Sequence, residues 1–224
     1  MSESKPHIVI FSHGFGVRKE DRGLFSAIAR VIPEAESVLF DYNPIHEASN
    51  TLTAEPLDEQ ARKLRKVINT NRTEYPNAII DLVCHSQGCV VAAMLKPRGI
   101  RKVIMLTPPD DVSVETVAKQ LSSHGAIDTS TRTRLARTDG STTVIHPDYW
   151  QSLAGIKPTK LYNLLARVTA LRIISARQDE VLGEVSFEGI HPGISVVKLD
   201  GNHNFDDEES RKRVLYILQK ELTL

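Results

Sequence analysis

The stretch Ala78-Ile79-Ile80-Asp81-Leu82-Val83-Cys84-His85-Ser86-Gln87-Gly88-Cys89-Val90-Val91 decides the fold of this chain. The apolar run 78–83 predicts a buried strand and the run 89–95 predicts a helix, with Ser86 at the sharp turn between them. Such a turn exposes the serine hydroxyl above the edge of a sheet, beside a helix N-terminus. We expect glycine at position 88 because the helix passes close to the strand there, and a β-carbon would collide. The equivalent position two residues before the serine also favours glycine, but this chain has Cys84, a small side chain.

The five residues 84–88 do not by themselves establish a nucleophile. Patterns this short occur by chance, and a lone serine in a turn is often an ordinary turn residue. The flanking strand and helix favour a nucleophile, since a strand before the serine and a helix after it distinguish this motif from a chance match. The hypothesis therefore depends on whether the rest of the chain supplies a base, an acid and an oxyanion hole.

Strand-like and helix-like segments alternate along most of the chain. Apolar runs predict strands at 7–11, 37–41, 78–83, 102–106, 171–175 and 194–199, and helical spacing predicts helices at 24–31, 57–68, 87–95 and 206–222. Continuous apolar strands separated by helices predict an α/β fold with a mainly parallel six-stranded sheet and helices on both faces. Right-handed crossovers then place the carboxyl ends of the strands at one edge, where ligands bind in open sheets.

The alternation is interrupted between residues 108 and 159. A helix is expected at 112–121, and two β-prone runs, 132–137 and 141–145, flank Asp139-Gly140, a strong hairpin signal. A further helix is expected at 160–168. The segment leaves the sheet at the carboxyl end of one strand and returns before the next. We therefore predict a single domain over residues 1–224, with 108–159 as a small inserted cap; the alternative is an ordinary surface excursion.

The composition excludes several classes of partner. Lysine and arginine together number 28, as do aspartate and glutamate, so no net charge points to nucleic acid or an anionic membrane. The apolar runs all fall short of the roughly 20 residues that cross a bilayer. We expect a small molecule as the partner, without nucleic acid or membrane, and the sequence leaves the oligomeric state open.

The amino-terminal residues and the two cysteines favour a cytoplasmic location. Residues 1–6 contain no basic region followed by an apolar one, so no secretory signal is expected. Cys84 and Cys89 are too few and too close for a disulfide framework, which agrees with a reducing compartment.

No metal and no cofactor are expected. Five of the eight histidines show no zinc-binding spacing: His7, His46, His124, His146 and His191. The glycines near the start do not form a dinucleotide fingerprint, and no phosphate-loop lysine followed by serine or threonine is present.

The chain resembles the α/β-hydrolase family over nearly its whole length. Four landmarks carry the resemblance in the family's order: Ser12-His13-Gly14-Phe15-Gly16 after the first strand, the turn at Ser86, Asp179 after a late strand, and His203 before the last helix. The first two strands of larger members are missing, so the chain is similar to a small, trimmed member. Serine at the turn disfavours members with an aspartate nucleophile.

The resemblance implies a nucleophile, a base and an acid. A serine hydroxyl attacks only if a base takes its proton, and the pKa of histidine suits that task. Ser86 would be the nucleophile and His203 the base, although His203 could also be a plain loop histidine. A carboxylate must then orient the imidazole. Asp179 fits the family position and is preferred over Glu180, and either could be a solvated loop acid.

The resemblance also implies an oxyanion hole. The backbone N–H of Gln87 follows the nucleophile at a helix start. The second donor would be the N–H of Phe15, where Gly14 and Gly16 allow the backbone to turn inward. His13 and His85 match family positions that shape these loops and are not expected to act as bases.

The predicted cap is expected to select the substrate. Trp150 and Tyr149 are the predicted substrate contacts, with Tyr162 as a further aromatic residue. Three arginines in the hairpin, Arg132, Arg134 and Arg137, could bind a carboxylate on the substrate, but alternation with Thr133, Leu135 and Ala136 also fits a solvated face.

The function predicted from these residues is a serine hydrolase similar to carboxylesterases, which cleaves a small ester through an acyl-enzyme. The same triad would serve a thioesterase, lactonase, amidase, acyltransferase or carbon–carbon bond hydrolase. A different class is a non-catalytic binding protein that has kept a hydrolase scaffold, because fold does not determine function.

Overall fold

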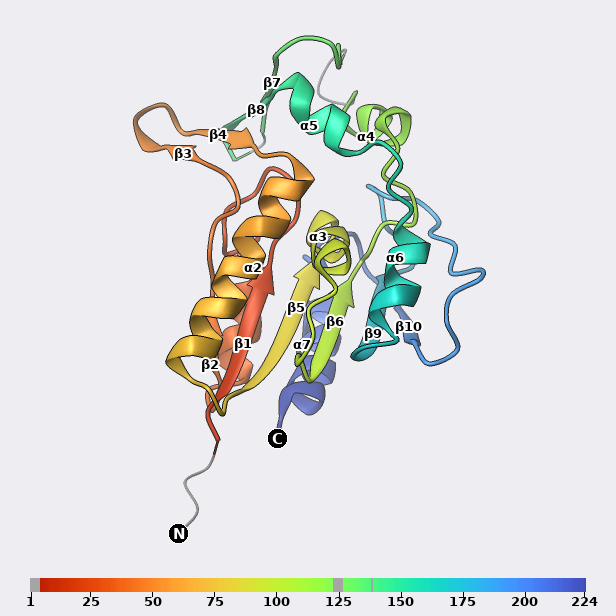
Figure 1. Ribbon diagram of the computed structural model, residues 1–224. Coiled ribbons are helices and arrows are strands. Elements are labelled where there is room, and N and C mark those ends of the chain that lie inside the picture. Colours follow the sequence, from red (N-terminus) through yellow and green to blue (C-terminus); the bar gives the residue numbers. More distant parts are fainter. Residues whose placement is uncertain (1–4, 123–126, 138) are drawn as a thin grey trace.

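The computed structural model describes residues 5–122, 127–137 and 139–224, and its centre is a six-stranded sheet (Figure 1). The strand order is β10-β9-β6-β5-β1-β2, and every neighbouring pair is parallel. The strands are β1 (His7–Ser12), β2 (Glu36–Val38), β5 (Ile79–His85), β6 (Lys102–Leu106), β9 (Ala170–Ala176) and β10 (Ser195–Leu199). The prediction of a six-stranded parallel sheet is confirmed.

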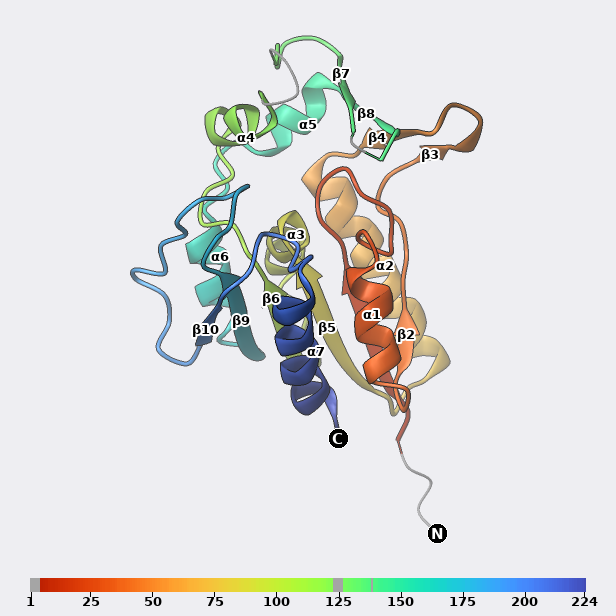
Figure 2. The ribbon, with the colours of Figure 1, turned by 180° about the vertical axis from the view of Figure 1, so that it is seen from behind.

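Helices cover both faces of this sheet (Figures 1 and 2). One face carries α2 (Leu57–Glu74), α3 (Gln87–Leu95) and α6 (Pro158–Leu165), and the other carries α1 (Leu24–Val31) and α7 (Glu208–Leu222). Side chains alternate between the two cores because successive residues of a strand point to opposite faces. In β1, Ile8 and Ile10 belong to one apolar cluster, and Val9 and Phe11 belong to the other. A strand buried on both sides needs an uninterrupted apolar run, which explains why these strands were recognisable.

Several predicted elements have different ends, and two of them show why. The strand expected at 37–41 stops at Val38, because the next residues bond to the loop after β1 instead of to a strand. There the carboxylate of Asp41 accepts the N–H of Lys19 (2.8 Å), and the N–H of Tyr42 donates to His13 Nε2 (3.0 Å). The helix expected at 57–68 continues to Glu74. It ends just before Tyr75-Pro76, since a residue that precedes proline disfavours the helical conformation.

A second sheet lies beyond the carboxyl ends of the main strands (Figure 1). Its strands are β3 (Ile45–His46), β4 (Thr51–Ala54), β7 (Thr133–Ala136) and β8 (Thr142–Ile145), in the order β3-β4-β8-β7. The antiparallel β7–β8 pair is the hairpin predicted from Asp139-Gly140. The parallel pairing of β4 with β8 was not predicted. Strands of two and four residues with polar positions are too short to show a period.

The segment 108–159 therefore does not form this layer alone. It contributes β7, β8, α4 (Val114–Leu121) and α5 (Pro147–Ser152), while residues 45–54, between β2 and α2, contribute the other two strands and the short 3-10 helix η1 (Glu47–Ser49). Residues 123–126 and 138 of the predicted cap lie outside the described residues. That the segment acts as a cap stays a prediction. Across the residues that the structure describes, no helix combines the length and apolar character needed to cross a bilayer.

A buried charge cluster joins the amino ends of three central strands. The carboxylate of Asp81, in β5, is fully buried. It accepts hydrogen bonds from His7 Nε2 (2.9 Å) in β1 and from Arg101 Nε (2.9 Å), just before β6. A carboxylate in the core is tolerated only when it is paired in this way.

Replacement of Asp81 by alanine should therefore destabilise the sheet. We expect Asp81→Ala to lower the free energy of unfolding by about 3 kcal/mol, because Arg101 and the buried His7 lose their acceptor. Urea unfolding followed by circular dichroism measures the change. Asp200→Ala is the control: its carboxylate lies 3.2 Å from Arg177 Nη1 but is largely exposed. That change should cost less than about 1 kcal/mol. Equal losses in the two variants would contradict the structural role of Asp81.

Candidate active site

Ser86 occupies a sharp turn between β5 and α3 in a strained conformation. Its backbone angles are φ 51° and ψ −126°, a combination that residues other than glycine rarely adopt. The turn is held by hydrogen bonds from the Ser86 N–H to the Leu106 carbonyl (3.0 Å) and from the Cys89 N–H to the Ser86 carbonyl (2.9 Å). Strain of this kind costs about 1–3 kcal/mol and persists only where surrounding contacts impose it.

Gly88 shows the close approach that the sequence indicated. A β-carbon there would lie 2.1 Å from the carbonyl oxygen of Ser12 and 2.7 Å from that of His13. Both are backbone atoms at the end of β1, so no side chain can move aside to make room. Cys84 is completely buried, and burial raises the pKa of its thiol to about 12. Cys84 is thus a neutral packing group at the position where the pattern favours glycine.

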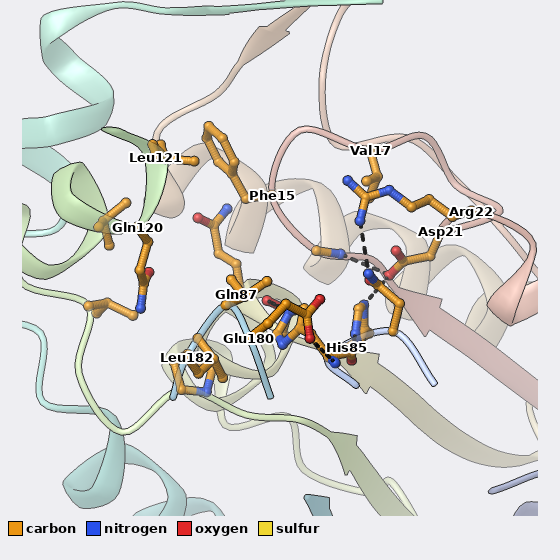
Figure 3. A pocket seen from close by; sticks show the side chains of 18 of the residues that line it. Phe15, Val17, Asp21, Arg22, His85, Gln87, Gln120, Leu121, Glu180 and Leu182 are labelled. Atoms are coloured by element: carbon orange, nitrogen blue, oxygen red, sulfur yellow. Dashed lines mark hydrogen bonds and ion pairs between the residues drawn. The ribbon is translucent and has the colours of Figure 1, made fainter. Parts of the chain in front are cut away.

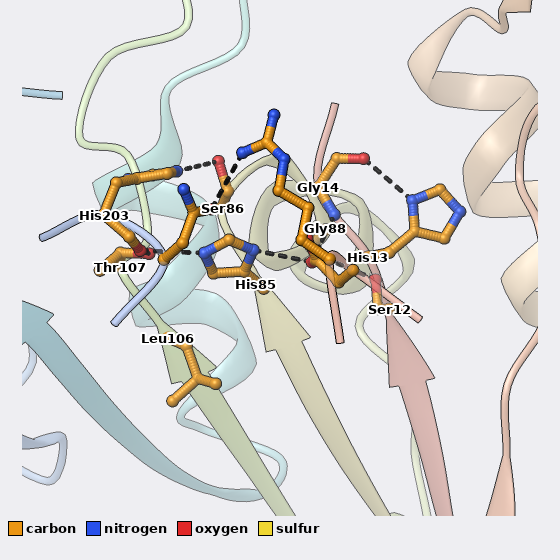
Figure 4. Close-up of polar contacts among 12 residues, drawn as sticks. Ser12, His13, Gly14, His85, Ser86, Gly88, Leu106, Thr107 and His203 are labelled. Carbon is orange, nitrogen blue, oxygen red and sulfur yellow. Dashed lines mark hydrogen bonds and ion pairs between the residues drawn. The ribbon is translucent and has the colours of Figure 1, made fainter. Parts of the chain in front are cut away.

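The structure brings Ser86, His203 and Asp179 together in a chain of hydrogen bonds. His203 Nε2 lies 3.0 Å from Ser86 Oγ (Figure 4), and His203 Nδ1 lies 2.8 Å from Asp179 Oδ2. His203 lies in the loop between β10 and α7, and Asp179 lies in the loop that follows β9. The three residues thus come from the carboxyl ends of three strands. The arrangement can pass a proton from the hydroxyl to an imidazole held by a carboxylate.

Asp179 and Glu180 hold His203 in different ways. Asp179 is buried, and its other oxygen accepts the N–H groups of Val181 (3.0 Å) and Leu182 (2.8 Å). Glu180 is exposed and accepts the backbone N–H of His203 (3.0 Å) with Oε2. Only Asp179 reaches the imidazole, and Glu180 fixes the backbone that carries it.

The residues that carry the two predicted oxyanion donors, Phe15 and Gln87, line the same cavity as Ser86. Gly14 packs against the serine so closely that a β-carbon on it would lie 3.2 Å from Ser86 Cβ. Phe15 is the next residue of this loop. The N–H of Gln87 lies at the start of α3. Neither N–H has a backbone acceptor within the described part of the chain. Both are therefore available to an incoming oxyanion.

A buried aspartate–histidine pair beneath the turn was missed by the sequence reasoning. His85 Nδ1 donates to Asp21 Oδ2 (2.7 Å), and His85 Nε2 donates to the carbonyl of His203 (3.1 Å). Asp21 also accepts the N–H of Gly14 (3.2 Å). One carboxylate thus connects the oxyanion loop, the serine turn and the loop of His203 (Figure 4). The polar run 18–22 looks like a solvated loop in sequence, so no local signal identifies Asp21.

Each member of the Asp21–His85 pair stabilises the charged form of the other. Burial alone lowers the pKa of His85, but the charge of Asp21 and its hydrogen bond outweigh burial and raise it. Burial alone raises the pKa of Asp21, and His85 outweighs it so that the net pKa is lowered. An imidazolium that donates from both nitrogens fits these shifts. His13 differs: burial lowers its pKa, and its Nε2 accepts the N–H of Tyr42.

A cavity of about 290 Å³ opens beside Ser86 (Figure 3). This volume is at the lower end for small-molecule sites, roughly 300–1,000 Å³. Apolar side chains form much of its wall: Phe15, Val17, Pro109, Val112, Val117, Leu121, Val181 and Leu182. The polar part of the wall includes His203, Glu180 and two arginines.

The predicted substrate contacts are only partly found at this cavity. Tyr149 lines it, packs 5.2 Å from Phe15 between ring centroids, and donates its hydroxyl to Gln87 Oε1 (2.6 Å). Trp150 is buried in the core and is not among the lining residues, and Tyr162 is buried with its hydroxyl on the Pro109 carbonyl. The predicted contact with Trp150 is therefore not supported by its position. Periodicity cannot tell which of two adjacent aromatic residues faces a cavity.

The described residues contain no group of three or more histidine, cysteine, aspartate or glutamate side chains placed to hold a metal ion. His124 lies outside the described residues.

Comparison with known proteins gives a likeness in structure alone. No family model and no curated protein sequence matches the chain. The esterase domain from a Rhodothermus marinus protein covers 98% of this chain and 88% of its own, at 17% identity and a TM-score of 0.68. Est1E from Butyrivibrio proteoclasticus, with ferulic acid bound, covers 98% of this chain and 90% of its own, at 17% identity and a TM-score of 0.71. A Paleococcus ferrophilus monoacylglycerol lipase covers 96% of this chain and 93% of its own, at 14% identity and a TM-score of 0.61. These matches show a common fold.

The Asp21–His85 pair should give the stability a distinct pH dependence. The raised pKa of His85 stabilises the folded state fully below the usual pKa of 6.5, and this contribution is lost as pH rises through the folded-state value. In Asp21→Asn, burial lowers the pKa of His85, so acid conditions destabilise the variant instead. We expect the loss of unfolding free energy in Asp21→Asn to be larger at about pH 5.5 than at about pH 8.5. Urea unfolding at both pH values measures it. A loss independent of pH would contradict the ion pair.

Proposed function

We propose that this chain, which has the α/β-hydrolase fold, is a serine hydrolase that cleaves small carboxylic esters through an acyl-enzyme. One observation carries the proposal: Ser86 Oγ, both nitrogens of His203 and a carboxylate oxygen of Asp179 form a continuous line, with distances of 3.0 Å and 2.8 Å. The strained turn at Ser86 supports it, because strain of this kind gathers at functional sites.

In the first half of the proposed reaction, Ser86 Oγ attacks the ester carbonyl carbon while His203 Nε2 takes the hydroxyl proton. The carbonyl oxygen becomes an oxyanion and accepts hydrogen bonds from the N–H groups of Phe15 and Gln87. The imidazolium then gives its proton to the alkoxide oxygen as the bond to the alcohol breaks. Asp179 accepts the Nδ1–H of His203 throughout, which keeps the tautomer correct and stabilises the positive ring.

In the second half, water replaces the alcohol. His203 takes a proton from the water as its oxygen attacks the acyl carbon of the Ser86 ester. The second oxyanion is bound by the same two N–H groups, and collapse returns the proton to Ser86 Oγ. The products are the carboxylic acid and free enzyme, so no cofactor or metal is consumed.

Two observations favour an ester as the substrate. The small, largely apolar cavity suits a short acyl or alkyl group. The structures compared above bear the names of esterases and of a monoacylglycerol lipase. Thioesters, lactones and amides would follow the same steps with a different leaving group.

Covalent labelling tests the nucleophile. A fluorophosphonate probe should label the wild-type protein at Ser86, and Ser86→Ala should remain unlabelled. The same change should lower the kcat for p-nitrophenyl acetate by about 10³-fold or more, because among the described residues no other hydroxyl is hydrogen-bonded to the imidazole of His203. Circular dichroism would establish that the variant is folded. Failure of the folded wild-type protein to react with the probe would contradict the proposal. A flat response to a panel of short and long esters would favour a binding protein instead.

A matched pair of variants tests the acid. We expect Asp179→Asn to lower kcat by up to about 10⁴-fold, because the amide cannot stabilise the imidazolium and favours the wrong tautomer. Glu180→Gln should lower kcat less than about tenfold, because an amide oxygen can still accept the N–H of His203. Both are measured with the same ester at saturating concentration. A larger loss in Glu180→Gln than in Asp179→Asn would assign the acid to Glu180.

A further inference from the structure

The charged groups around the cavity differ in the partners that they bind. Three carboxylates line it, and each is bound to donors of the protein itself. Asp21 binds His85, Glu180 binds the His203 N–H, and Asp111 binds the hydroxyl and N–H of Ser113. Two guanidinium groups also line the cavity, those of Arg22 and Arg137, and neither forms an ion pair with a carboxylate of the described residues. Among the described residues, the carboxylates that line the cavity thus have donors of the protein, whereas its two guanidinium groups have no carboxylate partner.

Arg137 is the more buried of the two cationic groups. It directly follows β7, and its guanidinium lies against the oxyanion loop, with Cζ 3.5 Å from the position of a β-carbon on Gly16. The side chain is half-buried, and no hydrogen bond from it to the described residues is found. Burial lowers the pKa of Arg137, and the positive charge of Arg22 lowers it further, while the charge of Asp139 acts in the opposite direction without forming an ion pair with it. A half-buried guanidinium that donates to none of the described residues is costly unless an anion is bound there.

Arg22 supplies the second positive charge on the same side. Its Nη1 donates to Asn204 Oδ1 at 3.3 Å, a weak bond to a neutral group. Asp21 and Arg22 both have positive φ, 46° and 53°. Asp21 is buried under the turn, and the side chain of Arg22 is exposed at the cavity. Figure 3 shows Arg22 beside Val17, across the cavity from Leu121 and Leu182. One end of the cavity is cationic and the other is apolar.

We propose that the substrate carries a carboxylate that binds to Arg137 and Arg22, a property that rests on the proposed hydrolase function. A carboxylate matches the forked donors of guanidinium and forms two parallel hydrogen bonds with it. Because the cavity is about 290 Å³, the ester and the carboxylate belong to one small molecule, a half-ester of a short dicarboxylic acid. The apolar wall near Leu121 and Leu182 receives the other end of the molecule. Among the three hairpin arginines, only Arg137 lines the cavity, while Arg132 and Arg134 are exposed.

A pair of esters of equal shape tests this preference. Monoethyl succinate has a carboxylate where ethyl isocaproate has an isopropyl group, and both release ethanol. We expect the wild-type kcat/KM to favour monoethyl succinate by about tenfold or more, the effect of one or two charge-assisted hydrogen bonds. Equal kcat/KM values for the two esters would overturn the proposal.

Variants locate the preference within the cavity. Arg137→Gln should lower the ratio of the two kcat/KM values by about tenfold, and Arg22→Gln should lower it less. Arg137→Lys should keep part of the preference, because the charge stays while the fork is lost. Arg134→Gln is the matched control, since it removes an exposed arginine from β7, the strand that Arg137 follows, and should leave the ratio unchanged. An unchanged ratio in Arg137→Gln would overturn the assignment.

Binding separates this proposal from the hydrolase proposal. Calorimetry on Ser86→Ala measures the affinity for both esters without turnover. Tighter binding of monoethyl succinate, lost in Ser86→Ala combined with Arg137→Gln, supports the anion site even if the wild-type protein hydrolyses neither ester. Equal affinities would overturn the anion site even if the protein hydrolyses both.

Discussion

The contact between α3 and the end of β1 is the constraint on which the candidate site depends. Gly88 allows the helix to pass directly over the carbonyl groups of Ser12 and His13, where any β-carbon would overlap with backbone atoms. The helix can therefore begin immediately after β5, and the residue between them must turn sharply. Ser86 takes the strained conformation that this turn requires. The same contact brings the loop after β1 beside the serine, so one packing contact positions both the nucleophile and the predicted oxyanion loop.

The Asp21–His85 pair extends this arrangement to the third loop. Asp21 accepts the N–H of Gly14, and His85, which directly precedes Ser86, donates to Asp21 and to the carbonyl of His203. Removal of an ion pair from water is costly, and it is tolerated here because each partner also bonds to the backbone. The pair thus couples the three loops that surround Ser86. Strain at Ser86 and at residues 21 and 22 is concentrated in the same small region, as expected for a site held by its surroundings.

The layer above the strands gives the cavity its two unlike ends. Hairpin β7–β8 carries Arg137 to the oxyanion loop, and α5 carries Tyr149 to the side chain of Gln87. Gln87 in turn accepts the Tyr149 hydroxyl and donates to Gln60 in α2. The residue that follows the serine is therefore connected to both the layer above and the main domain. The cavity's apolar and cationic walls come from different elements, so its polarity arises only when the layers are assembled.

The sequence by itself determined the parallel sheet, the position of Ser86 and the order in which serine, acid and histidine follow one another. These features are local, because buried strands appear as apolar runs and the serine turn depends on a few adjacent residues. The hairpin was predictable for the same reason, from Asp139-Gly140. Only the tertiary structure decided that β4 joins the hairpin, that Asp21 lies beneath the serine turn and that Arg137, unlike Arg134, lines the cavity. Each of these is a contact between segments far apart in the chain, and no local period or motif specifies which distant group a polar side chain will meet.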